Sequence, residues 1–255
     1  MKKANIISIV NQKGGTGKTT TALNIYQALR RKGFKTLLID LDAQANATDQ
    51  LLSVNPKYNI YDVLIGKIDI NQAIERSQNG DFIASSYNLS VFDIVLSGND
   101  KDKILRNALN GLKSEYDYII IDNPPVLNLL TINSLTACNH ALIVAQADIF
   151  SYKSICQIME TIQTIQKNNN FNVLGIVLTR YNGRTIITQT MTNNLSQLAT
   201  QFNITLLNTY IRENSSIKET QLLRKNIFDY APKSNGAKDY IKLTDEIISM
   251  INNEK

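Results

Sequence analysis

The chain has 255 residues, of which 43% are hydrophobic and 19% are charged, with 11 Gly and 4 Pro. This composition excludes a disordered, collagen-like or low-complexity protein, and the length lies near the upper limit for one hydrophobic core. Two cysteines, Cys138 and Cys156, are too few for a disulfide scaffold or a Cys-rich metal site. We therefore expect one α/β domain or a closely fused pair.

The N-terminal segment carries no sign of export. Met-Lys-Lys-Ala-Asn leads directly into a short apolar run and a Gly-rich loop, without the long apolar run and cleavage site of a signal peptide. No uncharged apolar stretch approaches the roughly 20 residues that cross a bilayer. We expect a cytoplasmic protein with no integral membrane association, and this expectation leaves association with a membrane surface open.

The net charge of +5 is unevenly distributed along the chain. Residues 180–242 contain nine Lys or Arg and four Asp or Glu, a balance of +5, so the rest of the chain nets to zero. This asymmetry favours an anionic partner for the C-terminal third, although a basic solvated face explains the charge about as well.

The first part of the chain reads as a strand, a loop, a helix and a second strand. Residues 5–10 and 35–41 are buried β-rich runs, and the helix between them ends near Gly33. Residues 43–115 are less regular. Their pattern predicts a helix near 69–76 and short strands near 82–85 and 91–95.

The second part of the chain repeats the alternation. Buried strands are predicted at 118–122, 140–145 and 172–178, and helices near 152–167, 185–200 and 240–251. Alternating strands and helices predict an α/β fold with a doubly wound, mostly parallel sheet flanked by helices. Ligand-binding loops are then expected at the carboxyl ends of the strands.

The strongest motif is Gly14-Gly-Thr-Gly-Lys-Thr-Thr20, which lies between a predicted strand and helix and is preceded by Lys13. Glycines let consecutive backbone N–H groups face one anion, and the N-terminus of the following helix adds partial positive charge. Lys18 can reach terminal phosphates, and the Thr19 hydroxyl can bind Mg²⁺. The predicted nucleotide ligands are Gly14, Gly15, Thr16, Gly17, Lys18, Thr19 and Thr20.

Three acidic residues close predicted strands. Asp40 and Asp42 end the second strand, and Asp122 ends the strand at 118–122. In a doubly wound sheet these carboxyl ends meet around the phosphate loop, where acids can hold Mg²⁺ through water and orient an attacking water. Taken singly, an Asp at a strand end is most often a helix cap or turn residue.

Three segments together, 13–20, 38–48 and 116–125, resemble the ParA/Soj partition ATPases, P-loop NTPases of the deviant-Walker (SIMIBI) class. The resemblance covers nearly the whole chain and continues in residues 178–185 and 232–240. It implies a single ParA-like ATPase domain over residues 1–255. The first strand begins by about Asn5, so we expect no N-terminal helix-turn-helix domain.

The resemblance also implies roles for individual residues. Lys13 matches the signature lysine that reaches the nucleotide of a partner subunit, and Lys18 and Thr19 match the phosphate and Mg²⁺ ligands. Asp42 matches the residue that positions the hydrolytic water. The implied catalytic residues are Lys13, Lys18 and Asp42. Asp40 and Asp122 match supporting acids around Mg²⁺.

Further positions match the family less tightly. By resemblance, Pro232 belongs to the motif near the base pocket. The family carries basic residues of its DNA-binding surface at the positions of Arg184, Arg212 and Lys218. This resemblance would explain the excess of positive charge in residues 180–242.

The implied function is ATP-dependent DNA partition with ATP and Mg²⁺ as cofactors. ATP would hold a homodimer that binds DNA non-specifically on the nucleoid, and slow hydrolysis would be stimulated by a ParB-like centromere-binding protein. One alternative is a membrane-surface or protein-cargo positioning ATPase resembling MinD, although residues 240–251 suit a core helix better than a lipid-facing one. Another is redox or small-molecule chemistry, including ATP-dependent ligases; an iron–sulfur cluster shared by a dimer needs two cysteines per chain in suitable loops, and Cys138 and Cys156 are poorly placed for it.

Overall fold

A computed structural model describes residues 3–52, 56–78, 80–96 and 100–253. The strands are β1 (Asn5–Val10), β2 (Thr36–Asp40), β3 (Ile74–Ser77), β4 (Gly80–Ile83), β5 (Tyr118–Asp122), β6 (His140–Gln146) and β7 (Asn172–Thr179). The α-helices are α1 (Lys18–Arg31), α2 (Asn46–Leu51), α3 (Ile60–Leu64), α4 (Phe92–Val95), α5 (Ile104–Ala108), α6 (Leu129–Ala137), α7 (Ile149–Gln166), α8 (Ile186–Gln201), α9 (Ser215–Leu223), α10 (Ile227–Tyr230) and α11 (Asn235–Asn253). Short 3₁₀ turns are η1 (Ile70–Ala73), η2 (Tyr87–Val91) and η3 (Leu109–Gly111).

The described strands form one seven-stranded sheet in the order β3-β4-β2-β5-β1-β6-β7. All neighbouring pairs are parallel except β3 with β4. Every residue of β1, β2 and β5 is buried, as expected for central strands covered on both faces. The doubly wound, mostly parallel sheet predicted from the alternating pattern is therefore confirmed.

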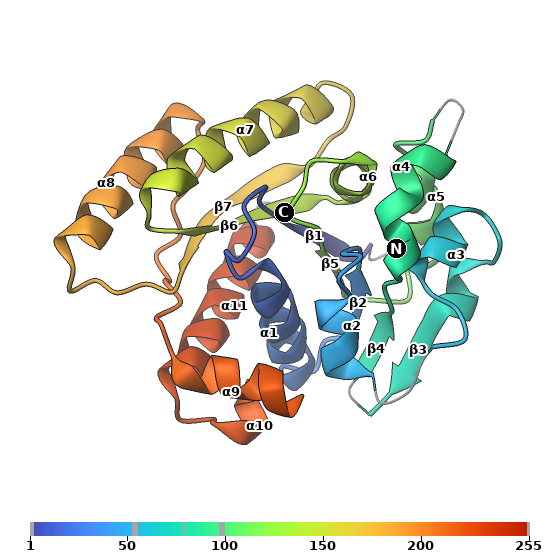
Figure 1. The fold of residues 1–255 in the computed structure, drawn as a ribbon, viewed down its shortest axis with the longest axis horizontal. Coiled ribbons are helices and arrows are strands. Elements are labelled where there is room, and N and C mark those ends of the chain that lie inside the picture. Colours follow the sequence, from blue (N-terminus) through green and yellow to red (C-terminus); the bar gives the residue numbers. More distant parts are fainter. Residues whose placement is uncertain (1–2, 53–55, 79, 97–99, 254–255) are drawn as a thin grey trace.

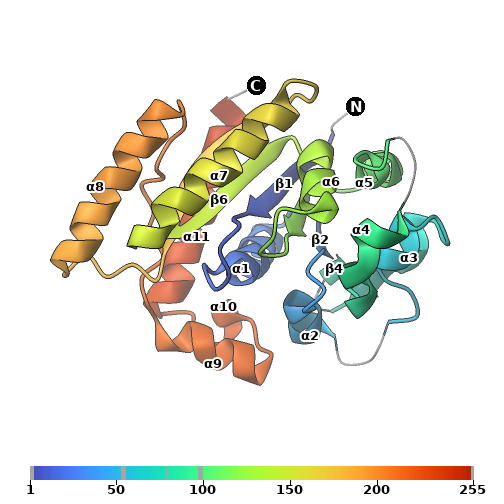
Figure 2. The same cartoon turned by 45° about the horizontal axis from the view of Figure 1, so that its top comes forward.

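Helices cover both faces of the sheet (Figures 1 and 2). On one face, α6, α7 and α8 pack over the sheet, and their buried side chains join those of α3 and α5 in one apolar cluster. On the other face, α1 and α11 pack against each other and against the sheet in a second cluster. The expected core helix at 240–251 lies within α11, whose buried side chains include Tyr240, Leu243 and Ile247.

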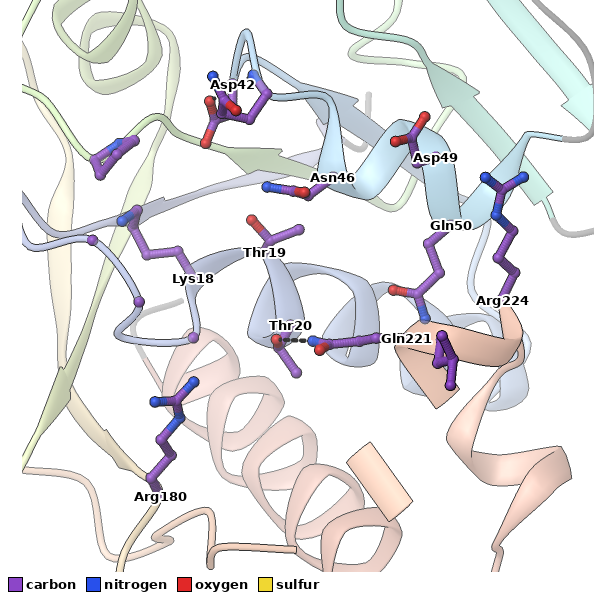
Figure 3. A pocket seen from close by; sticks show the side chains of 16 residues that line it. Lys18, Thr19, Thr20, Asp42, Asn46, Asp49, Gln50, Arg180, Gln221 and Arg224 are labelled. Atoms are coloured by element: carbon purple, nitrogen blue, oxygen red, sulfur yellow. Dashed lines mark hydrogen bonds between the residues drawn. The ribbon is translucent and has the colours of Figure 1, made fainter. Parts of the chain in front are cut away.

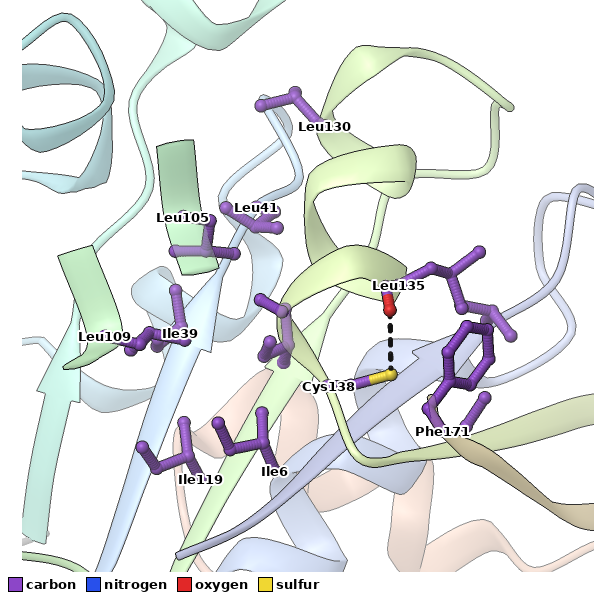
Figure 4. Close-up of a cluster of buried hydrophobic side chains, with 14 of the residues drawn as sticks. Ile6, Ile39, Leu41, Leu105, Leu109, Ile119, Leu130, Leu135, Cys138 and Phe171 are labelled. Carbon is purple, nitrogen blue, oxygen red and sulfur yellow. Dashed lines mark hydrogen bonds between the residues drawn. The ribbon is translucent and has the colours of Figure 1, made fainter. Parts of the chain in front are cut away.

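Cys138 lies inside the first apolar cluster, at the C-terminal end of α6 (Figure 4). Its thiol donates a hydrogen bond to the carbonyl of Leu135 at 3.3 Å, and the side chains of Ile6 and Phe171 belong to the same cluster. Cys156 lies on α7 and is partly exposed. The Cys138 side chain therefore packs in the hydrophobic core.

Two predicted elements in the irregular region are wrong. The helix expected near 69–76 is one 3₁₀ turn, held by a capping box between Asp69 and Gln72, and the chain then pairs as the antiparallel edge strand β3. The strand expected near 91–95 is α4, in which Phe92 is fully buried while Ile94 is exposed. In both places a tertiary contact decides the conformation of a short apolar run.

The register of the central strands sets the position of the acids. Asp40 and Asp122 are register partners on β2 and β5, and Ile9 on β1 pairs with Asp122 on the other side. The phosphate loop leaves β1 one residue later, so the acids and the loop meet at one edge of the sheet. Among the described residues, no helix is long and apolar enough to cross a membrane.

Candidate nucleotide-binding site

The loop between β1 and α1 leaves the start of the helix open to a ligand. Gly17 is the N-cap residue of α1, and its left-handed backbone (φ 93°) suits glycine. No side chain caps the helix, so its first N–H groups have no side-chain acceptor. A β-carbon at Gly17 would lie only 3.5 Å from the Thr179 hydroxyl, which shows how closely β7 approaches the loop.

A cavity of about 640 Å³ opens in front of this loop (Figure 3). It is lined by predicted ligands and by side chains from α2, α9 and the ends of β5 and β7. The lining residues are Gly14, Gly15, Gly17, Lys18, Thr19, Thr20, Asp42, Gln44, Asn46, Asp49, Gln50, Pro125, Arg180, Gln221, Leu222 and Arg224. Six of the seven loop residues predicted as ligands therefore face one space. Thr16 is fully buried behind the loop, where its carbonyl accepts a hydrogen bond from the Thr179 hydroxyl at 2.5 Å.

Lys18 is a buried cation at the floor of the cavity. Its ammonium donates to the carbonyl of Lys13 at 3.1 Å, and the residue is 6% exposed. Burial lowers the pKa of Lys18, while Asp122 and Asp42 oppose that change. An anion at the loop would complete the charge balance of this buried ammonium.

Asp42 and Thr19 line the cavity, whereas Asp40 lies behind it. The Asp40 carboxylate accepts hydrogen bonds from the amide of Asp42 at 3.0 Å and from the amide and hydroxyl of Thr48 at 2.9 and 2.8 Å. Both of its oxygens are therefore occupied in holding the loop that carries Asp42. These bonds give Asp40 a positioning role toward Asp42, and its role as a supporting acid around Mg²⁺ stays a prediction.

Asp122 is the acid whose oxygens accept no hydrogen bond of good geometry from the described residues, although the Thr19 hydroxyl and the Lys18 ammonium act on it. It is fully buried, and neither carboxylate oxygen has a hydrogen-bond partner among the described residues. Burial and the adjacent Asp40 carboxylate raise the pKa of Asp122 well above its usual value, against the Thr19 hydroxyl and the Lys18 ammonium. Burial likewise raises the pKa of Asp40 to about 6, although its hydrogen bonds to Thr48 and Asp42 oppose this.

These donors fit Mg²⁺ only in part. No group of three or more His, Cys, Asp or Glu side chains in the described ranges forms a metal cage. A hydroxyl at Thr19 with nearby carboxylates at Asp42 and Asp122 suits the Mg²⁺ mode that uses few protein ligands and completes its shell with waters and phosphates. The unpaired oxygens of Asp122 are consistent with that chemistry.

Lys13 does not line the cavity. Its ammonium lies 2.5 Å from a carboxylate oxygen of Asp148, the N-cap residue of α7, and 5.5 Å from the centre of the Phe150 ring. The side chain of the predicted signature lysine is therefore held at the start of α7 and lies outside the cavity of its own chain.

Several cavity residues were missed by the sequence reasoning. Arg180 and Arg224 both have left-handed backbones, with φ of 49° and 51°, and Gln221 donates to the Thr20 hydroxyl at 2.8 Å. A second, smaller pocket adjoins the cavity and shares Gly17, Thr20, Arg180 and Gln221 with it. The sequence signals for these arginines were the family resemblance over residues 178–185, which include Arg180, and the charge excess after residue 180.

Pro232 lies apart from the main cavity, and its predicted place near the base pocket stays a prediction. It lies in the connection between α10 and α11 and lines a separate pocket with Arg31 and Phe228. Neither the main cavity nor the adjoining pocket includes it.

The three predicted DNA-contacting residues differ in their surroundings. Arg184 is exposed and has no ion pair among the described residues. Arg212 makes a bidentate pair with Asp239, at 2.9 and 2.6 Å, and Lys218 lies 3.4 Å from Glu213. The structure therefore leaves Arg184 as an uncompensated cation and assigns Arg212 to a structural pair.

Comparison with known proteins places this site in a family. Residues 4–178 match the AAA domain family. The chain is 34% identical over 249 residues to the sporulation initiation inhibitor protein Soj of Bacillus subtilis, covering 95% of this chain and 97% of that protein. It is 32% identical to the chromosome partitioning protein ParA of Caulobacter vibrioides, covering 96% and 94%.

Solved structures agree on the fold. Cobyrinic acid a,c-diamide synthase of Mycobacterium smegmatis, with a bound ATP analogue and magnesium, superposes with a TM-score of 0.84 at 26% identity, over 99% of this chain and 97% of that chain. The cell division ATPase MinD of Pyrococcus furiosus gives 0.79 at 28% identity, over 97% and 99%. Binding of nucleotide and Mg²⁺ is thus a property of this fold, and the chain belongs to the ParA/Soj family of P-loop partition ATPases.

Proposed function

We propose that the protein is an ATP-switched partition ATPase. ATP joins two copies, the dimer binds DNA without sequence preference, and hydrolysis stimulated by a ParB-like centromere-binding protein resets it. The observation that carries the proposal is the similarity to Soj and ParA along nearly the whole chain, at 34% and 32% identity.

The cavity supplies groups suited to phosphoryl transfer. Lys18 and the open start of α1 suit the terminal phosphates, and Thr19 suits Mg²⁺, which when bound would neutralise charge on those phosphates. Asp42 lies on the same cavity wall, where its carboxylate can orient an attacking water. No arginine finger from the same chain is assigned, so we expect hydrolysis to be slow without a partner.

The position of Lys13 supports a role between subunits. Its ammonium is outside its own cavity and is 27% exposed, in an ion pair with Asp148. An exposed ion pair contributes little stability, so a nucleotide phosphate offered by a second copy can replace Asp148 as the partner of Lys13. The dimer then places one Lys13 at each nucleotide.

The basic C-terminal third supports DNA binding. Residues 180–242 hold the whole net charge of +5, and Arg184 is an exposed cation within this region. Non-specific binding requires only phosphate contacts from Lys and Arg, and a dimer doubles their number. We expect binding to follow ATP because the dimer brings two such faces together.

The test is binding of a DNA duplex of arbitrary sequence by fluorescence anisotropy, with ATP, ADP or no nucleotide, at about 50 and about 200 mM salt. The proposal expects binding with ATP only, weakened at least tenfold at the higher salt. Arg184→Ala should weaken it, whereas Arg106→Ala, an exposed arginine on α5, should not. ATP binding without DNA binding in any condition would overturn the DNA role.

A positioning ATPase of the MinD-like type is the second candidate, favoured by the structural similarity to MinD. The burial of Tyr240, Leu243 and Ile247 against the rest of the fold leaves the apolar face of α11 unavailable to lipid. Sedimentation with anionic vesicles in the presence of ATP, together with absent DNA binding, would favour this second candidate.

A further inference from the structure

A further cavity lies at the opposite edge of the sheet from the nucleotide-binding site. Its volume is about 600 Å³, close to that of the main cavity, and the two share no lining residue among those described. Its walls come from the start of α5, from α6 and from the C-terminal end of α7, which lie next to one another in Figures 1 and 2. Because α6 and α7 end just before β6 and β7 begin, this cavity lies at the amino ends of the strands.

A buried side chain holds two walls of this cavity together. Asn133 on α6 is fully buried, and its Oδ1 accepts from the amide of Leu105 on α5 at 3.1 Å. Its Nδ2 donates to the carbonyl of Lys101 at 2.8 Å, just before α5 begins. The segment that carries Arg106 is therefore fixed against α6, and the cavity is a built feature of the fold.

The hydroxyl of Thr136 lacks the partner that other helical threonines of this chain have. On α7, Thr161 and Thr164 each donate to the carbonyl of the residue four positions earlier, at 3.2 and 2.9 Å. Thr136 on α6 lines the cavity, is 4% exposed, and its oxygen has no hydrogen-bond partner among the described residues. A buried hydroxyl without a partner costs free energy unless a bound molecule supplies one.

Arg106 offers the same cavity a cation that no acid pairs with directly. Its guanidinium donates to the neutral side-chain oxygen of Asn169 at 3.1 Å, and no acidic side chain of the described residues forms an ion pair with it. Lys103, the other cation of the lining, is paired with Asp100 at 2.6 Å. The remaining N–H groups of Arg106 can therefore bind a carboxylate or a phosphate in bidentate fashion.

The surroundings of Arg106 are basic. Burial lowers the pKa of Lys113, and the charges of Arg106 and Lys3 lower it further. Asp102 is the single acid that the described residues contribute to the cavity lining. Repulsion among the three neighbouring cations favours binding of an anion beside them.

We propose that this cavity binds a small organic anion. The Arg106 guanidinium binds its phosphate or carboxylate group, and the Thr136 hydroxyl donates to one of its oxygens. Ile132 and Ile165 give the cavity apolar surface for the carbon skeleton. The site is separate from the nucleotide-binding cavity and does not depend on the proposed function.

The test is a titration of the isotope-labelled full chain with phenyl phosphate, benzoate and inorganic phosphate, followed by amide NMR. Signals from residues 102–106 and 164–169 report this cavity, and signals from residues 14–20 report the nucleotide-binding cavity. The same titration therefore distinguishes the two sites. Phenyl phosphate and benzoate distinguish a phosphate from a carboxylate as the preferred group, and inorganic phosphate lacks the carbon skeleton.

Three variants accompany the titration. Arg106→Gln removes the cation, and Thr136→Val removes the hydroxyl at nearly constant shape. Arg184→Gln, at another exposed arginine with no ion pair among the described residues, is the matched control. Thermal unfolding of each variant checks that the fold is intact.

The proposal expects phenyl phosphate or benzoate to bind in this cavity with a dissociation constant of about 1 mM or tighter, and inorganic phosphate to bind at least about fivefold more weakly. Arg106→Gln should weaken binding about tenfold and Thr136→Val about threefold, with the control unchanged. Thr136→Val should also raise the melting temperature of the ligand-free chain by about 2 °C, because it removes a buried oxygen without a partner.

Three results would overturn the proposal. The first is that neither organic probe shifts the signals of residues 102–106 and 164–169. The second is parent-like affinity in Arg106→Gln, which would remove the proposed anion contact. The third is displacement of the bound probe by a DNA duplex, which would assign the cavity to the phosphates of DNA.

Discussion

The ammonium of Lys13 and the carboxylate of Asp148 form an ion pair at 2.5 Å, although the two residues are 135 positions apart in the chain. The other carboxylate oxygen of Asp148 accepts from the amides of Phe150 and Ser151, at 3.0 Å each, and so caps α7. Partial burial alone would raise the pKa of Asp148, but Lys13 and Ser151 outweigh it and hold that pKa below its usual value. Asp148 is thus ionised at neutral pH and holds Lys13 in an ion pair, which the proposed contact of Lys13 with a partner's nucleotide would have to replace.

Asp148→Asn tests this replacement. An Asn oxygen can still cap α7, but the negative charge that holds Lys13 is gone. We expect the proposed ATP-dependent dimer to form at a protein concentration about two- to fivefold lower, measured by sedimentation velocity. Asp245→Asn, which removes the partner of Lys32 in another exposed pair, is the control. A weaker dimer in Asp148→Asn would mean that Asp148 itself contributes to the interface.

Alanine substitutions at Lys18 and at Lys13 should affect ATP binding and dimer formation differently. Lys18→Ala removes the only lysine that the described residues contribute to the cavity lining, so we expect ATP affinity to fall by about a hundredfold or more. Lys13→Ala should keep most ATP affinity in the single chain, since Lys13 does not line that cavity, but should lose the dimer. Calorimetry and sedimentation report the two properties separately. Equal loss of ATP affinity in both variants would contradict the assignment of Lys13 to a second subunit.

Asp42→Ala should uncouple binding from hydrolysis. The Asp42 carboxylate lines the cavity without contacting Lys18 through a hydrogen bond, so ATP affinity should change little. We expect the hydrolysis rate to fall by about a hundredfold or more, and the ATP dimer to persist. Phosphate release and dimer lifetime check this. Wild-type hydrolysis by Asp42→Ala would show that another group orients the water.

Asp122→Asn should stabilise the chain when nucleotide and Mg²⁺ are absent. Because burial raises the folded-state pKa of Asp122 well above its usual value and that of Asp40 to about 6, ionising the pair costs stability, and this cost grows as the pH rises above about 4. We expect the melting temperature to rise by roughly 3 °C or more at pH 8 in EDTA, and by less at pH 5. Asp229→Asn, in an exposed pair with Arg31, should change little at either pH. An equal gain at both pH values would rule out the charge as its cause.

Gly175→Ala should destabilise the edge of the sheet that supports the site. Gly175 has φ of 135°, and a β-carbon there would lie 2.2 Å from the Thr205 carbonyl oxygen, which already accepts from the amide of Ile176. We expect the melting temperature to fall by about 6 °C or more. Gly111→Ala, where an added β-carbon meets nothing within 4 Å, is the control. A parent-like melting temperature in Gly175→Ala would show that this edge can shift.

The phosphate loop and the sheet could be predicted because both depend on residues that are close together in the sequence. A strand, a glycine-containing loop and a helix must be adjacent in the sequence for the helix start to face an anion, so Gly14 to Thr20 identify the site without a fold. The buried runs at 5–10 and 118–122 likewise require a covered parallel sheet. The helix predicted at 69–76 and the strand predicted at 91–95 were wrong, because the conformation of such short apolar runs depends on the residues against which they pack.

The sequence by itself determined the nucleotide loop, the family and which segments of the chain form the main strands. Each of these depends on contiguous residues. Only the tertiary structure decided which acids face the cavity, that Asp148 holds Lys13 and that Asp239 neutralises Arg212. These outcomes join residues up to 135 positions apart, through strand register and helix packing. No local pattern encodes such distances, because burial and pairing of a charge are properties of the assembled fold.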